Sequence, residues 1–318
     1  MSSNKRRNFI KTSALVAGAI VQLGIYQDAW AYMNSLPSDP LDINVFSKHL
    51  HFLDYKSLGE KANELGFSGV DLTVRNHGHV LPENVNRDLP LAIDAINRSG
   101  SKCTMITTAI ESVQNPLDIN VLKMASKCGI TYYRTNWFRY SEEEDMLSSI
   151  RKYKKQIQEL TILNKELDLI GCYQNHSGIK VGASYWEVYQ LLEGINSMYF
   201  GTQYDIRHAI AEGANSWENG LRLLKPYIRT IVLKDFKWQK VKGKWKVVNV
   251  PIGEGLVNFT AYFRLLKQYK LRPPVSLHLE YDLGGAEKGM KSIKVNKEVV
   301  YNAMKKDLDM VQKLWRLA

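Results

Sequence analysis

Strand-like and helix-like segments alternate along this chain from residue 43 to its C-terminus, and this alternation constrains the fold more than any other feature. Segments with helical periodicity separate the strands, as in residues 55–67, where Leu58, Ala62 and Leu65 fall on one stripe. Eight such repeats predict a single (β/α)8 TIM barrel of the α/β class. The strand-like runs lie at residues 43–50, 69–74, 102–109, 131–135, 167–175, 200–206, 228–236 and 275–282.

Length and local motifs favour this barrel over a doubly wound sheet, which is the main alternative. The chain has 318 residues, of which 45% are hydrophobic and 24% charged, and these values are ordinary for a globular protein. Gly66 and Gly129 each separate a helical segment from the next strand, where a left-handed C-cap lets the chain turn back. No G-x-G-x-x-G motif follows the first strand. We therefore expect one barrel domain over residues 32–318.

The first 31 residues are expected to be an export signal. The stretch NKRRNFIK contains a twin-arginine pair, Arg6 and Arg7, and is followed by an apolar run and by AWA at residues 29–31, a small-x-small cleavage site. The apolar run is too short for a comfortable membrane helix. We predict a Tat-type signal over residues 1–31, a mature chain without a membrane span and a periplasmic or otherwise exported protein. A basic helix that stays attached is the alternative.

Net charge bears on whether the protein binds nucleic acid, and the cysteine pattern bears on whether it contains disulfides. The formal net charge is +11, of which the signal accounts for +3, so the mature chain carries about +8. Its Lys and Arg residues are spread over helices such as IRKYKKQIQEL, which is typical of a solvated face, and we expect no nucleic-acid partner. The three cysteines lack a C-x-x-C motif and are interpreted as buried free thiols.

All seven histidines fall near predicted strand ends, and none falls inside a predicted helix. In a TIM barrel the active site lies at the C-terminal ends of the strands and in the loops after them, so we expect several of these imidazoles to line one pocket. Each one taken alone could equally be a structural or surface residue. Acidic residues stand beside them, namely Asp71, Asp205, Asp235 and Glu280. The histidines are His49, His51, His77, His79, His176, His208 and His278.

The stretch SLHLEYDLGG places His278 and Glu280 on one face of the predicted eighth strand, because side chains two residues apart share a face. If that face points into the barrel mouth, the pair offers a base or ligand and an adjacent hydrogen-bonding partner. A structural ion pair inside the barrel is the alternative. Lys234 ends the seventh strand in LKDF, where it can stabilise an enolate oxygen, carry a proton or merely neutralise acidic neighbours.

Over roughly residues 43–315 the chain resembles the xylose isomerase-like TIM barrels, the sugar phosphate isomerase/epimerase superfamily. The resemblance is carried by ELGFSGVDL, YDIRHA, LKDF, VPIGEG and a Glu on the last strand. It implies one divalent ion, held by a Glu ending strand 5, an Asp ending strand 6, a His on strand 7 and a Glu on strand 8, with the two Glu residues moving protons. Position by position, it assigns the strand 6 ligand to Asp205, the strand 8 ligand to Glu280 and a substrate contact to His208.

Two positions depart from the family pattern. Gln174 stands where the first Glu is expected, and Val232 stands where the metal-binding His is expected. Gln offers an amide oxygen to a hard cation but cannot act as a base, and Val can do neither. The resemblance therefore implies a site for one divalent cation (Mn, Mg, Co or Zn) at Asp205, Glu280 and Gln174, completed by a relocated imidazole.

Other residues near strand ends are candidates for holding a carbohydrate. Aromatic rings stack on the apolar faces of sugars, and the guanidinium groups of Arg75 and Arg134 can grip hydroxyl or anionic groups. The stretch KWQKVKGKWKVVNV alternates and turns at Lys242–Gly243, so it predicts a β-hairpin that serves as a lid. The candidate substrate-binding residues are Gln174, His176, His208, Arg207, His49, Asp235 and Trp238.

These observations predict an exported sugar isomerase/epimerase-like enzyme that abstracts a proton next to the carbonyl of a sugar or keto-sugar, with assistance from a divalent cation. The candidate catalytic residues are Glu280, His278 and Lys234. Because the paired Glu is missing, β-elimination or hydration on a 3-keto-glycoside is an alternative chemistry. A non-catalytic carbohydrate-binding barrel and a metal-dependent nuclease are the rival classes. The expected partner is a small carbohydrate, and the sequence leaves self-association open.

Overall fold

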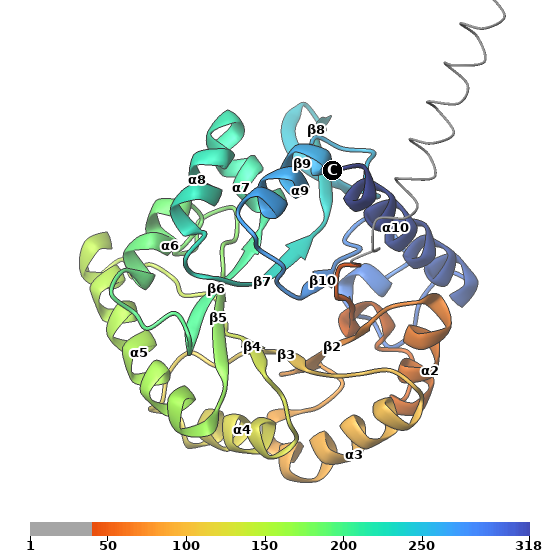
Figure 1. Cartoon of the computed structure of the whole chain (residues 1–318), viewed down its shortest axis with the longest axis horizontal. Coiled ribbons are helices and arrows are strands. Elements are labelled where there is room, and N and C mark those ends of the chain that lie inside the picture. Colours follow the sequence, from red (N-terminus) through yellow and green to blue (C-terminus); the bar gives the residue numbers. More distant parts are fainter. Residues whose placement is uncertain (1–39) are drawn as a thin grey trace, which may run out of the picture. The chain divides into compact units, whose positions relative to one another are not determined.

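The computed structural model describes residues 40–318, so the predicted signal over residues 1–31 and the predicted start of the mature chain at Tyr32 lie outside the described residues. Eight parallel strands close into a barrel in the order β1-β10-β7-β6-β5-β4-β3-β2, and helices surround it (Figure 1). The predicted (β/α)8 barrel is confirmed. Its strands are β1 (Ile43–Phe46), β2 (Gly69–Val74), β3 (Met105–Thr108), β4 (Tyr132–Arg134), β5 (Ile170–Gln174), β6 (Phe200–Asp205), β7 (Ile228–Leu233) and β10 (Val275–Leu277).

The helices of the described chain pack on the outside of the barrel. The sixth repeat contains two consecutive helices, α7 and α8, where the sequence predicted one helical segment. The α-helices are α2 (Tyr55–Leu65), α3 (Val85–Arg98), α4 (Pro116–Lys127), α5 (Met146–Leu167), α6 (Tyr185–Leu192), α7 (Ile206–Gly213), α8 (Trp217–Leu224), α9 (Phe259–Gln268) and α10 (Lys297–Leu317). Short 3-10 helices are η1 (Ser47–Leu50), η2 (Pro82–Asn84), η3 (Ala214–Ser216) and η4 (Ala286–Lys288).

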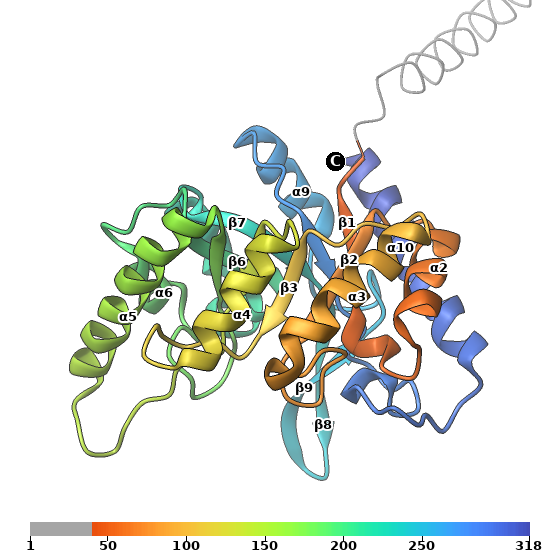
Figure 2. The same ribbon diagram turned by 90° about the horizontal axis from the view of Figure 1, so that it is seen from below.

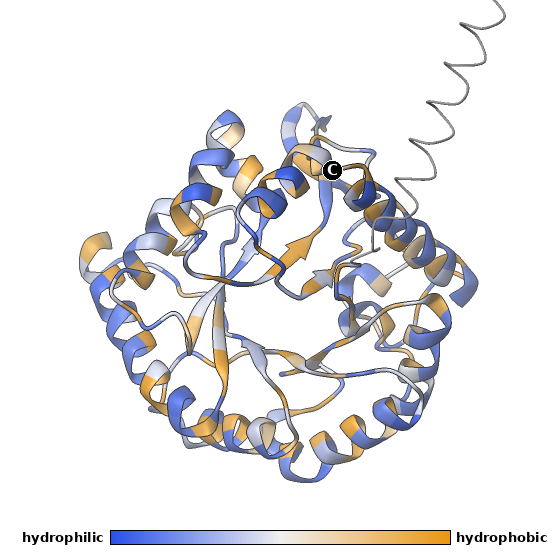
Figure 3. Ribbon diagram, viewed as in Figure 1, coloured by the Kyte–Doolittle hydropathy of each residue, from blue (hydrophilic) through white to orange (hydrophobic). Residues whose placement is uncertain are grey.

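Local sequence explains where the helices begin, end and pack. The Asp54 side chain accepts the Ser57 backbone N–H at 2.8 Å and so caps the N-terminus of α2, while Gly66 ends that helix with a φ of 90°. In α10, Val300, Met304, Leu308, Val311 and Trp315 form a buried stripe. Hydrophobic and hydrophilic residues alternate in this way along the helices in Figure 3. The helices therefore cover the barrel with their apolar faces.

The two faces of the barrel strands differ in character. Every residue of β2 is buried: Val70, Leu72 and Val74 belong to the hydrophobic core, while the Asp71 carboxylate meets hydroxyl groups from β3 and β10. Strands buried on both faces are typical of parallel barrels. Inward-facing polar residues thus occupy the barrel interior, and apolar residues fill the layer between strands and helices.

The predicted hairpin is present. It consists of β8 (Asp235–Val241) and β9 (Lys244–Val250), which pair antiparallel around Lys242 and Gly243. Both turn residues have positive φ, 48° and 80°, as a tight hairpin turn requires. Figure 2 shows β8 and β9 projecting from one end of the barrel.

The first and last barrel strands end earlier than predicted, and this changes where His49 and His278 lie. The last strand ends at Leu277, because the His49 ring accepts the Leu279 backbone N–H at 3.0 Å and replaces the strand partner there. His278 and Glu280 therefore follow β10 rather than belong to it. His49 lies in η1, where the first strand was predicted to continue, and His208 lies in the first turn of α7, directly after β6. Within residues 40–318 no helix combines the length and apolar character needed to span a bilayer.

Candidate active site

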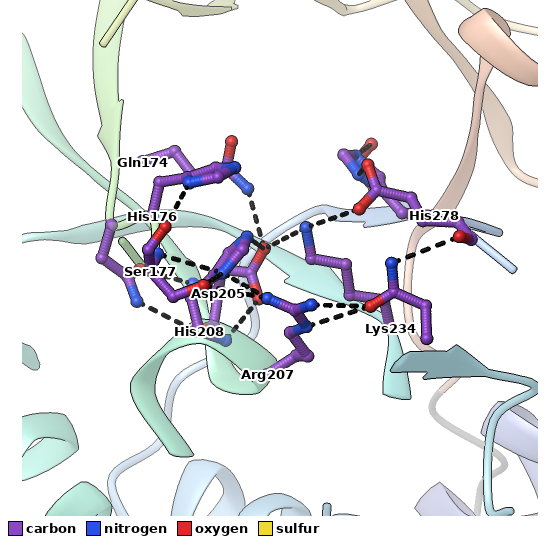
Figure 4. A network of polar contacts seen from close by, with 12 residues as sticks. Gln174, His176, Ser177, Asp205, Arg207, His208, Lys234 and His278 are labelled. Carbon is purple, nitrogen blue, oxygen red and sulfur yellow. Dashed lines mark hydrogen bonds and ion pairs between the residues drawn. The ribbon is translucent and has the colours of Figure 1, made fainter. Parts of the chain in front are cut away.

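The C-terminal ends of β6, β7 and β10 bring two carboxylates and a lysine together. The Lys234 Nζ lies 3.1 Å from Asp205 Oδ2 and 3.2 Å from Glu280 Oε2 (Figure 4). Parallel strands end at the same rim of a barrel, and this arrangement gathers residues that are far apart in the sequence. The lysine thus bridges the two acids that the sequence predicted as metal ligands.

Asp205 is held in place by its position at the start of a helix. It is the N-cap of α7, and its carboxylate accepts the His208 backbone N–H at 3.1 Å. Gln174 Nε2 donates to the same carboxylate at 2.8 Å. The Asp205 side chain is fully buried. Asp205 therefore positions Lys234 and Gln174, and it presents no free carboxylate oxygen to a substrate.

Gln174 has a fixed orientation because both ends of its amide are used. Its Oε1 accepts a hydrogen bond from Arg134 Nη1 at 3.0 Å, and its Nε2 donates to Asp205. A guanidinium only donates and a carboxylate only accepts, so the amide cannot be reversed. Gln174 links the end of β4 to the end of β6.

Glu280 is the carboxylate that remains accessible. Its side chain is 24% exposed, and Lys48 Nζ lies 3.3 Å from Oε1 while Lys234 contacts Oε2. Burial alone would raise its pKa, but the charge of Lys234, the nearby His278 and the charge of Lys48 together hold the pKa of Glu280 well below its usual range. Glu280 is therefore an ionised carboxylate at neutral pH.

His278 lies between Glu280 and a second buried acid, Asp71. Its Nδ1 is 3.7 Å from Glu280 Oε1, and its Nε2 is 3.1 Å from Ser276 Oγ, which donates to Asp71 Oδ2 at 2.6 Å. Burial lowers the pKa of His278 to about 3, so the imidazole is neutral. The Phe46 ring stacks on it with centroids 4.1 Å apart. The imidazole of His278 and the carboxylate of Glu280 thus both line the pocket.

A second pair of imidazoles lies on the other side of Asp205. His208 Nδ1 receives hydrogen bonds from Ser177 N at 3.1 Å and from Arg207 Nη1 at 2.8 Å. Because Nδ1 accepts, the ring proton is on Nε2, which lies 3.6 Å from Asp205 Oδ2. The His176 ring packs against the His208 ring at a tilt of 35°, with centroids 4.1 Å apart. Burial lowers the pKa of both histidines, that of His176 to about 3.

Arg207 ties this side of the site to the hairpin. Its Nε and Nη2 donate to Asn249 Oδ1 at 3.1 and 2.8 Å, and its guanidinium lies 5.4 Å from the Phe236 ring centroid. Asn249 Nδ2 in turn donates to the Glu280 backbone oxygen at 3.2 Å. Arg207 therefore connects α7, the hairpin and the segment that carries Glu280.

These groups surround a small pocket of about 40 Å³ at the C-terminal rim of the barrel. Its wall is rich in cationic side chains from several strand ends. The lining residues are Phe46, Lys48, Arg75, Arg134, Trp137, Gln174, His176, Lys234, His278 and Glu280. A larger cavity of about 360 Å³ lies at the opposite end, among the loops that precede β4, β5 and β6, where Asp168 is the only ionisable acid or base of the lining apart from a tyrosine. The ionisable side chains are therefore concentrated at the C-terminal rim of the barrel.

Five predicted substrate-binding residues do not line this pocket, namely His49, Arg207, His208, Asp235 and Trp238. His49 is fully buried, with one ring nitrogen 3.3 Å from the Ala286 oxygen and the other accepting the Leu279 N–H. Asp235 accepts four backbone N–H groups at 2.8–3.1 Å, from residues 236, 253, 255 and 257, and so shapes the loop after the hairpin. Trp238 lies on β8 and is 47% exposed.

Sequence reasoning did not single out Phe46 and Lys48 as site residues, although both line the pocket. They follow the inward-facing periodicity of β1, and Lys48 lies in η1, which the sequence predicted as a continuation of the strand. Residues two apart in a strand share a face, so Phe46 and Lys48 could have been placed together on the inner face. Nothing else in this segment marked that face as part of a site.

The residues present do not fit the predicted divalent cation. The ammonium of Lys234 already lies between the carboxylates of Asp205 and Glu280, the Gln174 amide oxygen is turned to an arginine, and Val232 is an apolar neighbour of Asp205 on β7. A cation would meet the positive charge of Lys234 at this point. Over residues 40–318, no three His, Cys, Asp or Glu side chains are arranged to hold a metal ion.

The fold and the strand-end site define a class of barrel that acts on small molecules at its C-terminal rim. Residues 59–296 match the family model of the xylose isomerase-like TIM barrel, and the chain belongs to this family. No protein with a curated description matches it.

Solved structures with the same fold extend over most of the chain. A xylose isomerase-like TIM barrel protein from Mycobacterium smegmatis in complex with magnesium is 11% identical over 87% of this chain and 99% of that one, with a TM-score of 0.63. A D-allulose 3-epimerase from Methylomonas sp. in complex with D-allulose is 11% identical, with coverages of 86% and 97% and a TM-score of 0.62. A 3-keto-D-glucoside 4-epimerase from E. coli is 9% identical over 83% of this chain and 97% of that one, with a TM-score of 0.60. Structural neighbours thus include sugar epimerases.

Proposed function

We propose that this protein is an enzyme that removes a proton from the carbon next to the carbonyl of a sugar or keto-sugar, with Glu280 as the base. The observation that carries the proposal is an accessible carboxylate whose pKa is held well below its usual range by Lys234 and Lys48, in a pocket at the C-terminal rim of a xylose isomerase-like barrel. The low pKa keeps this carboxylate ionised at neutral pH but also makes it a weaker base, so its accessibility at the rim of the barrel carries the assignment.

The proposed step uses Lys234 as the electrophile. The C–H bond breaks, the proton goes to Glu280, the electron pair forms a carbon–carbon double bond, and the carbonyl π electrons move to oxygen. A lysine ammonium has three N–H donors, of which two meet Asp205 and Glu280, so one remains for this oxygen. A cationic donor in a dry site stabilises the developing enolate. Return of the proton to the former carbonyl carbon, with the proton of the adjacent hydroxyl group moving to the enolate oxygen, completes an isomerisation.

His278 is suited to share the proton that Glu280 has taken. It is neutral, and its Nδ1 has no hydrogen-bond partner among the described residues while lying 3.7 Å from Glu280 Oε1. The Ser276 hydroxyl contacts its other nitrogen. Proton sharing through His278 would return Glu280 to its ionised state for the second half of the reaction.

β-Elimination on a 3-keto-glycoside is the second candidate, and the environment of Gln174 favours it. A two-carboxylate shuttle needs a second base, but the Gln174 amide donates to Asp205, and Asp205 is buried. Elimination needs one base, an acid for the leaving group and an oxyanion stabiliser. The fold of a 3-keto-D-glucoside 4-epimerase accommodates a keto-glycoside, which makes this substrate class a reasonable probe.

Hydrogen–deuterium exchange tests both candidates at once. D-allulose, D-fructose and methyl 3-keto-α-D-glucopyranoside are incubated with the enzyme in D₂O and followed by NMR. We expect deuterium at the carbon next to the carbonyl, with a new isomer or with release of methanol. Glu280→Gln should abolish the exchange, and Glu254→Gln, an exposed glutamate paired with Lys306, serves as the matched control. Tight binding of a sugar without any exchange would instead support a non-catalytic carbohydrate-binding barrel.

We also propose that the protein is exported through the twin-arginine pathway, on the basis of Arg6 and Arg7. Cell fractionation of the full chain tests this. Replacement of both arginines by lysine should retain the protein in the cytoplasm, and unchanged export would exclude the twin-arginine route.

A further inference from the structure

The pocket contains more positive than negative charge. Lys48, Arg75, Arg134 and Lys234 line it, and Glu280 is the only carboxylate of the lining. The two lysines contact Glu280, but neither arginine has a carboxylate of the described chain within ion-pair distance. Two guanidinium groups therefore enter the pocket without an acidic partner.

Arg134 is the more constrained of the two. It is only 4% exposed, one nitrogen donates to Gln174, and its Nε has no hydrogen-bond partner among residues 40–318. Its guanidinium lies 4.2 Å from the centroid of the Trp137 ring, which limits its movement. Burial, followed by the charge of Arg75, lowers its pKa, and the more distant charges of Asp71 and Glu280 offset this only in part. A buried donor without an acceptor is costly, so a ligand that supplies the acceptor is favoured.

Arg75 faces the same space from the end of β2. Its guanidinium lies 5.7 Å from the Phe46 ring centroid and makes no side-chain hydrogen bond or ion pair with the described residues. Asp71 and Glu280 attract its charge from a distance, but neither carboxylate forms an ion pair with it. Both guanidinium groups are therefore available to bind an anionic group of a ligand.

We propose that Arg75 and Arg134 form a subsite for a negatively charged oxygen group of the substrate, a carboxylate or a phosphate. The subsite rests on the proposed function in one respect, namely that this pocket holds the substrate. Guanidinium groups bind such groups through two parallel hydrogen bonds, and two of them can share one anion. Because the subsite and Glu280 line one pocket, the reacting sugar is an acidic one, a sugar acid or a sugar phosphate.

Binding of sugar alcohols and acids that lack an aldehyde or ketone tests the subsite without any turnover. Isothermal titration calorimetry at low salt compares D-glucitol, D-gluconate and D-glucitol 6-phosphate. One of the two anions should bind at least about tenfold more tightly than D-glucitol, since a hydrogen bond to a charged group contributes roughly 1.5–3 kcal/mol. The tighter of the two identifies the group as carboxylate or phosphate.

Variants assign the effect to the two arginines. Arg134→Gln should remove most of the preference for the anion and leave D-glucitol binding unchanged, and Arg75→Gln, at a half-buried position, provides a second variant if the first fails to fold. Arg139→Gln, at an exposed position on the same loop, is the matched control and should change nothing. Glu280→Gln should keep the anion preference while losing deuterium exchange, which separates this inference from the proposed reaction. Equal binding of all three probes, or an anion preference that survives both arginine variants, overturns it.

Discussion

Two carboxylates inside the barrel, Asp71 and Glu280, differ in the partners that surround them. They lie at the two ends of one chain of contacts through Ser276 and His278. Asp71 receives hydroxyl groups, and burial raises its pKa, whereas Glu280 receives two lysines that keep its pKa low. Location in the barrel interior therefore does not decide what a carboxylate does. Burial with hydroxyl partners favours the protonated form of Asp71, whereas two lysines keep Glu280 ionised, as the proposed base requires.

The largest expected effect comes from neutralising each carboxylate by the same chemical change. Glu280→Gln should lower the rate of deuterium exchange by about 10³-fold or more, because it removes the base. Asp71→Asn should lower it by less than about tenfold, since an amide can still meet Thr107 and Ser276. Exchange rates measured side by side test the contrast, and a comparable loss in both variants would show that Asp71 takes part in the reaction.

Removal of the lysine that joins Asp205 to Glu280 should be almost as damaging. Lys234→Met is expected to slow exchange about 10²- to 10³-fold, because the enolate loses its cationic donor and Glu280 loses the charge that keeps its pKa low. The variant should also lose activity as the pH falls toward 6, which the wild type does not. Lys237→Met, at an exposed position on the hairpin, is the control, and an equal effect there would remove Lys234 from the mechanism.

Acid should unfold the protein before it protonates Glu280. Burial lowers the pKa of six histidines, so they bind protons in the unfolded chain near pH 6.5 but not in the folded chain, and stability is lost as the pH falls below that value. The raised pKa values of five aspartates oppose this loss, but they are outnumbered by the six imidazoles; they are Asp118 and Asp307, at about 6, and Asp71, Asp205 and Asp235. We expect the Tm to drop by roughly 5–10 °C between pH 7 and pH 5. Calorimetry tests it, and a constant Tm would contradict neutral, buried imidazoles. The histidines are His49, His51, His79, His176, His208 and His278.

The pH dependence of the reaction distinguishes a carboxylate base from an imidazole base. With Glu280 ionised and His278 neutral throughout, the wild-type exchange rate should change less than about twofold between pH 7.5 and pH 6. Rates are taken at a temperature where the protein stays folded. A loss of activity with an apparent pKa near 6.5 would assign the base to a histidine instead.

Removal of metal ions should have the smallest effect. The ammonium of Lys234 fills the position between the two predicted carboxylate ligands, so prolonged dialysis against EDTA should leave the exchange rate unchanged. Activity that disappears with the chelator and returns with Mg²⁺ or Mn²⁺ would show that Lys234 moves aside for a cation, and it would restore the ligand set of Asp205, Glu280 and Gln174.

Periodicity and local chemistry made much of the fold predictable. The eight strand-like runs, Gly66 as a helix terminator and the Lys242–Gly243 turn follow from residue types within a few positions of one another. Strand ends were less predictable, because they depend on distant partners. The last strand stops at Leu277 only because His49, more than two hundred residues earlier in the chain, accepts the next backbone N–H.

The candidate site was predictable in part for the same reason. His278 and Glu280 line one pocket, as their two-residue spacing suggested, although both follow the strand instead of lying on it, and Lys234 does contact acidic neighbours. Nothing local shows that Asp235 is occupied by four backbone N–H groups, or that Lys48 reaches Glu280 from the first repeat.

The sequence by itself determined the barrel, the family pattern and the set of chemically capable residues, because these depend on periodicity and on residue identity. Only the tertiary structure decided which groups pair with which. Asp71, Asp205, Asp235 and Glu280 are equivalent in the sequence as acids near strand ends, and they differ in the structure because hydroxyl groups, backbone N–H groups or lysines from other strands surround them. A carboxylate acquires its pKa and its role from neighbours that the closed barrel brings together, and those neighbours are remote in the chain.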